Sequence, residues 1–223
     1  MNSAAPVIVP IFATPFAVVA TGTPANLNTK LAALFRERAT EERRDPALPR
    51  DPFCFRSRED LFEWDLPEVG QLRADILAAV CATAMSVSGC SEAEFDALRV
   101  QARGRFAIVR PEGCIPASTA PMASWYGLYC VTAPSEAVDR ADSAVLRLYG
   151  IRQGMMFKDA ANWVLRSPYG DSHYLWRPVS GQMAVFPASI LHEVALNRAN
   201  GDLVLVMARV RFAHGDAAVT PPW

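Results

Sequence analysis

Histidine is rare in this chain. The 223 residues contain three histidines, His173, His192 and His214. Imidazole is the most common metal ligand among protein side chains and the usual general acid or base near neutral pH. Any site that needs two or more imidazoles must therefore draw on these three positions.

Cysteine is present, but in no metal-binding or disulfide pattern. The cysteines are odd in number and contain no Cys-x-x-Cys pair: Cys54, Cys81, Cys90, Cys114 and Cys130. Zinc sites and the disulfide frameworks of secreted domains usually show paired, regularly spaced cysteines. We therefore expect free, buried thiols in a cytoplasmic protein, with a zinc site or disulfides as the alternative.

Strong net charge and long apolar runs are also missing. The net charge is −1, so no strong field would attract nucleic acid or an anionic membrane. The first apolar run, residues 7–20, is broken by Pro10 and Pro15, and no Lys or Arg precedes it. A secretory signal needs a basic start and an unbroken apolar core, and a membrane span needs about 20 apolar residues. We therefore expect neither.

Helical patterns fill the first hundred residues. Leu27, Leu31 and Phe35 share one helical face, and residues 66–85 carry an apolar stripe at helical spacing. Ser91 and Glu94 form a capping-box pattern, which predicts a short third helix running toward Leu98. We expect these helices to cover one face of a sheet.

Strand-like runs follow from residue 104 onward. Proline, glycine, aspartate and serine separate short apolar runs over residues 105–110, 125–131, 144–149, 183–186, 190–196 and 203–212. The 17 prolines and 12 glycines of the chain are typical of such a turn-rich region. The sequence thus predicts one α+β domain over residues 1–223, with a helix-rich part (1–100) and a jelly-roll-like β-barrel core (104–212).

Several of these stretches, taken in order, resemble a subfamily of the 2-oxoglutarate and Fe(II) dependent oxygenases. The block from Gly181 to Val194 is similar to the segment that carries that family's distal histidine, which would be His192. The other matching stretches are Ile11–Phe16, Ser57–Phe62, Phe106–Ser118, Trp125–Val131 and Leu146–Arg152. The resemblance implies a double-stranded β-helix core, also called jelly-roll or cupin-like, with the N-terminal helices packed on one sheet.

The chain departs from the family where the metal and the co-substrate would bind. The family reads His-x-His-Pro before the Trp125 strand, whereas this chain has Ser118, Thr119, Ala120 and Pro121. About ten residues after the distal histidine the family has an arginine for the 2-oxoglutarate carboxylate, and here Leu203 stands in that neighbourhood. A hydroxyl and a methyl group do not replace imidazole ligands of Fe(II). We expect a degenerate member without metal or cofactor.

One alternative ligand set remains. Asp171 and His173 are two residues apart, so on a strand they share a face, and with His192 they would form a two-histidine, one-carboxylate set. The competing interpretation is a surface loop, since Tyr169-Gly170-Asp171-Ser172 is strong turn chemistry. Under the metal hypothesis the cofactors would be Fe(II) and 2-oxoglutarate.

Five residues are candidates for a site without metal. His192 is the candidate general acid or base, because its ordinary pKa near 6.5 suits both roles; the alternative is a buried core histidine. Ser118, Tyr126, Arg152 and Arg209 are candidate substrate-binding residues. For Tyr126 the alternative is core packing, and for Arg209 it is a strand-end cation that reaches solvent or, if it points inward, needs an acidic partner.

Three functions stay open. The first is a small-molecule barrel in specialised metabolism that performs acid–base chemistry such as elimination, cyclisation or isomerisation. The second is a pseudoenzyme that stabilises a partner enzyme, or pairs with a second copy of itself. The third is an active Fe(II) oxygenase with atypical ligands. An uncovered polar pocket at His192 favours the first, and a pocket filled by Tyr126 and Met122 favours the second.

Overall fold

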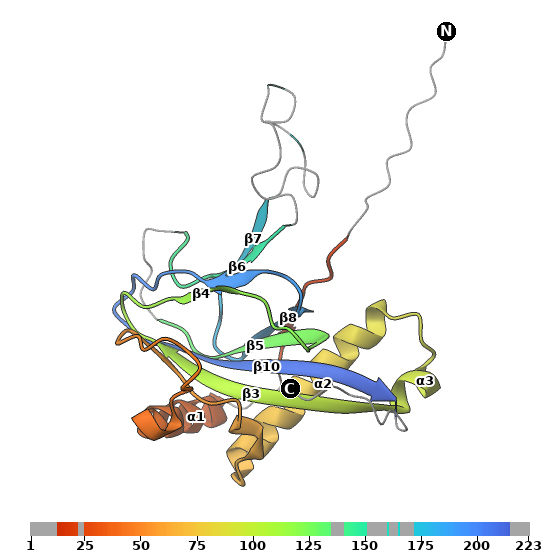
Figure 1. Cartoon of the computed structure of the whole chain (residues 1–223), viewed down its shortest axis with the longest axis horizontal. Coiled ribbons are helices and arrows are strands. Elements are labelled where there is room, and N and C mark those ends of the chain that lie inside the picture. Colours follow the sequence, from red (N-terminus) through yellow and green to blue (C-terminus); the bar gives the residue numbers. More distant parts are fainter. Residues whose placement is uncertain are drawn as a thin grey trace.

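The computed structural model describes residues 13–21, 25–134, 141–150, 160, 165 and 172–214. Two antiparallel sheets stack on each other, and the long helices lie on the outer side of the larger sheet (Figure 1). The helices are α1 (Ala25–Arg38), α2 (Pro67–Val87) and α3 (Glu92–Asp96), with 3-10 turns η1 (Glu41–Arg43) and η2 (Leu61–Glu63). The strands are β1 (Ala17–Ala20), β2 (Cys54–Arg56), β3 (Leu98–Val109), β4 (Ile115–Ser118), β5 (Trp125–Thr132), β6 (Leu146–Tyr149), β7 (His173–Trp176), β8 (Gln182–Pro187), β9 (His192–Val194) and β10 (Leu203–His214).

The strand order is that of a double-stranded β-helix. The major sheet has the order β1-β8-β5-β10-β3-β2, and the minor sheet has the order β4-β9-β6-β7. From β3 onward the chain passes back and forth between the two sheets, and all pairs between the strands named above are antiparallel. The predicted α+β class with a jelly-roll core is confirmed.

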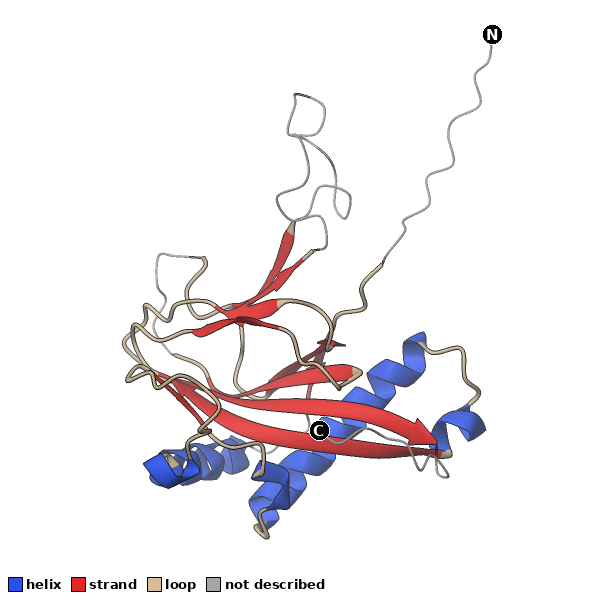
Figure 2. Cartoon of the chain, viewed as in Figure 1, coloured by secondary structure: helices blue, strands red, loops and turns tan. Residues whose placement is uncertain are grey.

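The helix layer covers the outer face of the major sheet, as Figure 2 shows for α1 and α2. The stripe predicted for α2 is fully buried, and it packs with α1 against every second residue of the central strands, such as Val204 and Val206 on β10. The stripe residues are Val69, Leu72, Ile76 and Val80. The helical spacing therefore identified the face that joins helix to sheet.

A second core fills the space between the two sheets. The alternating residues of the same strands, such as Leu203 and Leu205, point into it, because side chains on a strand alternate between faces. The minor sheet adds Leu146 and Val194 from its inward face. The barrel interior is thus packed with apolar side chains over most of its length.

Some element boundaries differ from those predicted. The capping box at Ser91 is present and opens α3, but the helix ends at Asp96 and β3 begins at Leu98 rather than at residue 105. The first residues of β3 are polar and alternate weakly, and their pairing with β10 makes them a strand. The sequence patterns also missed the short strands β2, β4 and β7.

All five cysteines are free thiols, as expected. Burial raises the pKa of Cys54 and that of Cys130 to about 12 each, so both stay protonated. The expectation of burial is met by Cys54 and Cys130 alone, since Cys81 and Cys114 are only partly buried and Cys90 is exposed. Separately, none of the helices in the described ranges has both the length and the apolar character needed to cross a membrane.

Candidate functional site

His192 opens β9 and marks one end of the barrel. Its Cα pairs with Ser118 on β4 and with Leu148 on β6, both in the minor sheet. The inward residues of the major sheet at the same level are Tyr126 and Arg209, which pair with each other across β5 and β10. We call the end of the barrel interior that contains these residues the His192 end. The opposite end of the interior lies at the start of β10, and we call it the Leu203 end.

The imidazole of His192 is packed rather than open to solvent. The residue is 6% exposed, and its ring centroid lies 4.5 Å from that of Tyr126 and 5.0 Å from that of Phe186. Its Nδ1 lies 2.8 Å from the carbonyl oxygen of Ile190, which can only accept, so Nδ1 carries the proton. Burial lowers the pKa of His192 more than this hydrogen bond raises it, so the ring is neutral near pH 7.

Tyr126 fills the space beside His192. The side chain is buried, and its ring also packs against Phe186, with centroids 5.4 Å apart. Burial raises the pKa of Tyr126, and the phenol stays neutral. The filling role predicted for Met122 is wrong, because Met122 is exposed. Phe186 packs against the His192 ring together with Tyr126.

Ser118 stands opposite His192 across the β4–β9 pair. Residues directly opposed on antiparallel strands project to the same face, so the Ser118 and His192 side chains lie on one face of the minor sheet. Ser118 is exposed, and Ala120 is buried with its amide donating to the carbonyl of Ala188 at 2.9 Å. Neither side chain offers a strong metal ligand.

The alternative ligand set does not come together around His192. Tyr174 and Trp176 point toward the barrel interior, so His173 lies on the outer face of the minor sheet, opposite to His192. His173 is exposed, and its Nδ1 lies 3.1 Å from the Ser172 hydroxyl oxygen. Asp171, like Arg152, lies outside the described residues. Among the residues that are described, no group of three His, Cys, Asp or Glu side chains is placed to hold a metal ion.

Fe(II) and 2-oxoglutarate therefore do not fit the described residues around His192. One imidazole with a hydroxyl and a methyl group in place of its partners leaves the metal short of ligands. At the Leu203 end, Leu203 and Leu205 are both fully buried and apolar, so they offer no cation for a carboxylate. We derive no chemical step through either group.

Arg209 does point into the barrel, and an acidic partner meets it there. Its Nη1 lies 2.9 Å and 3.2 Å from the two carboxylate oxygens of Glu59, and its Nη2 donates to the carbonyl of Pro121. The Oε1 of Glu59 also lies 2.6 Å from Nη2 of Arg105, whose Nη1 donates to Asp45 at 2.9 Å. Burial alone would raise the pKa of Glu59, but the two guanidinium groups outweigh it and lower that pKa. Sequence patterns did not identify Glu59, Arg105 or Asp45.

A His-x-Asp sequence, the usual start of an iron site in this fold, occurs only near the C-terminus. It comprises His214, Gly215 and Asp216. His214 is the last residue of β10, beyond Arg209, and it is exposed. Asp216 lies outside the described residues. His214 is five residues beyond Arg209 along the strand, or about 17 Å, so it does not join His192.

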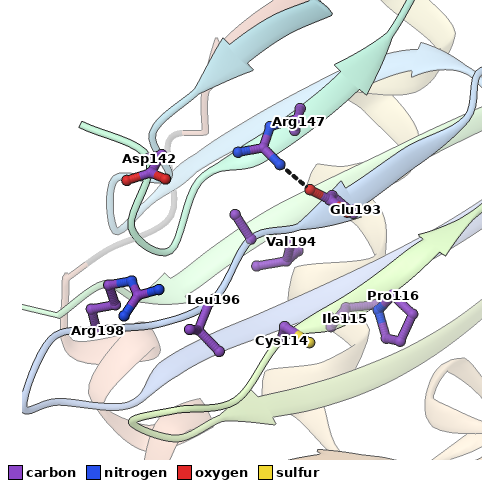
Figure 3. Close-up of a pocket in the computed structure, with 10 residues that line it drawn as sticks. Cys114, Ile115, Pro116, Asp142, Arg147, Glu193, Val194, Leu196 and Arg198 are labelled. Atoms are coloured by element: carbon purple, nitrogen blue, oxygen red, sulfur yellow. Dashed lines mark hydrogen bonds and ion pairs between the residues drawn. The ribbon is translucent and has the colours of Figure 1, made fainter. Parts of the chain in front are cut away.

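A separate pocket lies on the outer face of the minor sheet (Figure 3). It holds about 220 Å³, and its lining includes Cys114, Asp142 and Arg198. Glu193 lines it too, paired with Arg147, because Glu193 points away from the barrel interior while its neighbour His192 points in. This pocket therefore does not give access to His192.

The strand order defines a double-stranded β-helix, a fold that solved α-ketoglutarate dependent enzymes share. Solved structures with this fold include a prolyl-4-hydroxylase from Pseudomonas putida, 16% identical, which aligns over 88% of this chain and 91% of its own with a TM-score of 0.57. The non-haem α-ketoglutarate dependent carbocyclase SnoK from nogalamycin biosynthesis is 10% identical over 88% of this chain and 79% of its own, with a TM-score of 0.59.

HygX from Streptomyces hygroscopicus, solved with nickel and 2-oxoglutarate bound, is 12% identical over 88% of this chain and 82% of its own, with a TM-score of 0.55. At these identities the likeness establishes the fold. No protein-family model matches the chain, and no curated protein matches it either.

Proposed function

We propose that this chain is a degenerate relative of the 2-oxoglutarate and Fe(II) dependent oxygenases that works without iron or 2-oxoglutarate. The observation that carries the proposal is the packing of His192 against Tyr126 and Phe186, at the place where the family holds its metal. Ser118 and Ala120 in place of two imidazoles, and Leu203 in place of an arginine, support it.

We infer further that the barrel is a pseudoenzyme that stabilises a partner enzyme. A filled His192 end favours this function over small-molecule catalysis, since the side chains that would face a substrate contact one another instead. Three exposed apolar side chains belong to segments at the same end: Met122 (46% exposed) follows Pro121, Leu191 (39%) precedes His192, and Tyr174 (54%) pairs with Leu148, the strand partner of His192. Apolar groups that remain exposed together on a folded domain commonly mark a protein interface.

Acid–base chemistry at His192 is the second candidate. Because Nδ1 donates to Ile190, the neutral ring keeps its lone pair on Nε2, as a general base requires. Two proteins of the same fold, the carbocyclase SnoK and the α-ketoglutarate dependent epimerase SnoN, belong to nogalamycin biosynthesis. An elimination, cyclisation or isomerisation in specialised metabolism would suit this candidate, provided that Tyr126 moves to admit a substrate.

Two point variants separate the candidates. In the organism that carries the gene, we would exchange the wild-type gene for one that encodes Leu191→Asp or His192→Gln. The metabolite profile of each strain would then be compared with that of a deletion strain. A partner-stabilising role predicts that Leu191→Asp reproduces the deletion profile and that His192→Gln does not. The reverse pattern would favour acid–base chemistry. Leu175→Asp, on the outer face of the minor sheet, is the control for an added surface charge, and thermal unfolding of each purified variant checks that it folds.

A further inference from the structure

Glu59 lies in a segment that runs along the edge of the major sheet. After β2 ends at Arg56, the backbone amide of Ser57 donates to Phe106 at 2.9 Å, and the amide of Phe106 donates to the Ser57 hydroxyl at 3.0 Å. Asp60 then forms a parallel bridge with Gly104 on β3. The segment is thus held against β3 on both sides of Glu59.

Gly104 permits this close approach. A Cβ at that position would come within 2.7 Å of the ring of Phe62, so any other residue would push Phe62 and its segment away from β3. Phe62 anchors the segment on the helix side of the sheet, where it joins the core. Glu59 can then extend around the edge of β3 toward the barrel interior.

The carboxylate of Glu59 ends between two guanidinium groups. Arg105 on β3 and Arg209 on β10 belong to neighbouring strands and share the inward face. The three side chains are mostly shielded from water, with exposed fractions of 15% for Arg105, 19% for Arg209 and 16% for Glu59. Two shielded arginines that share one carboxylate are a typical arrangement for binding a carboxylate ligand.

Other groups hold the two arginines in place. Asp45 accepts a hydrogen bond from Arg105, and the carbonyl of Pro121 accepts one from Arg209. The strands that carry the arginines pair along twelve residues of β10, from Leu203 to His214. Removal of the Glu59 carboxylate therefore leaves two positioned guanidinium groups facing a small empty space.

We propose that Arg105 and Arg209 form a carboxylate-binding site at the His192 end of the barrel and that Glu59 is its built-in ligand. The site accepts a small carboxylate, and the segment at residues 57–63 supplies one from within the chain. A tethered carboxylate has a high effective concentration, so free carboxylates do not displace it at low millimolar concentration. The proposal does not depend on whether the barrel is catalytic or on whether it binds a partner.

Acetate is the probe, and Glu59→Ala is the variant that vacates the site. We would measure the thermal unfolding midpoint of wild type and variant in sodium acetate and in sodium chloride of equal ionic strength. Glu59→Ala is expected to be less stable than wild type in chloride and to gain about 2–4 °C in acetate, saturating with acetate concentration. Wild type is expected to unfold at the same temperature in both salts.

The double variant Glu59→Ala/Arg209→Met tests whether the gain comes from this site. It is expected to lose the acetate effect, since one of the two cations is gone. Glu41→Ala, which removes an exposed carboxylate that pairs with Arg44 and Arg50, is the matched control and is expected to unfold at the same temperature in acetate and chloride. Equal midpoints of Glu59→Ala in acetate and chloride would overturn the proposal, as would an equal acetate gain in the double variant or in Glu41→Ala.

If Glu59→Ala does not fold in chloride, the folded fraction measured by circular dichroism replaces the midpoint. Acetate is then expected to restore folding of the single variant and not of the double variant. Failure of acetate to restore the single variant would refute the site. None of these outcomes bears on metal binding or on a partner, so the carboxylate site and the proposed function are tested separately.

Discussion

The two ends of one strand, β10, face the same barrel interior with different chemistry. At the Leu203 end, Leu203 and Leu205 are completely buried among apolar neighbours. At the His192 end, six residues or about 20 Å further along, Arg209 is fixed by Glu59 and Pro121. The family to which the sequence bears a resemblance has its carboxylate-binding arginine at the first end. In this chain the inward arginine lies at the second end, and its carboxylate partner belongs to the chain.

The difference implies two modes of stabilisation. Close packing stabilises the Leu203 end, where the loss of a methylene group leaves a cavity. At the His192 end, charged side chains that are shielded from water compensate one another. Substitutions at the two ends should therefore lower the free energy of unfolding by different amounts. Those losses should also respond differently to pH and to salt.

Leu205→Ala is expected to have the largest effect. The residue is fully buried between the sheets, and Leu→Ala at such sites costs about 2–5 kcal/mol of unfolding free energy. Urea denaturation followed by circular dichroism would measure the loss. The control is Leu175→Ala on β7, where the side chain is 37% exposed and the cost should be about 1 kcal/mol or less. Similar losses for the two variants would mean that the Leu203 end is not tightly packed.

Arg209→Met is expected to cost less, about 1–3 kcal/mol. The substitution keeps much of the apolar stem but leaves Glu59 with Arg105 alone and the carbonyl of Pro121 without this donor. Arg50→Met is the control, because Arg50 forms only an exposed pair with Glu41 and should change stability by about 0.5 kcal/mol or less. An unfolding free energy that Arg209→Met leaves unchanged would show that the Arg209–Glu59 pair makes no net contribution to stability.

The smallest effects are expected in the pH dependence of the free energy of unfolding. There, two groups at the His192 end, His192 and Glu59, should contribute in different pH ranges. Since burial lowers the pKa of His192, the unfolded chain takes up a proton first as pH falls through about 6.5, and the free energy of unfolding decreases. The pKa of Glu59 is also lowered, so its contribution is present at neutral pH and is lost only as pH falls below about 4.5.

Unfolding free energies between pH 7.5 and pH 3.5 would test this separation. His192→Gln is expected to flatten the dependence near pH 6, and Glu59→Gln is expected to flatten only the more acidic limb. His173→Gln, at an exposed position, should retain both. An unchanged slope near pH 6 in His192→Gln would contradict the assignment of that titration.

The sequence predicted the packing features better than the charged ones, for physical reasons. The stripe of α2 from Val69 to Val80 and the capping box at Ser91 are local patterns, and the structure contains both. The polar start of β3 was missed because only its pairing with the distant β10 makes it a strand. An inward Arg209 was expected to need an acidic partner, but the partner, Glu59, is 150 residues away in the chain.

Metal binding by the wild-type protein tests the central claim most directly. Calorimetric titration with Co(II), as a stand-in for Fe(II), would be performed with and without 2-oxoglutarate, and repeated with His192→Gln. The account predicts no saturable binding at one site per chain in wild type, because the described residues give His192 no partner ligands of the required kind. Stoichiometric Co(II) uptake that 2-oxoglutarate strengthens and His192→Gln abolishes would contradict the account.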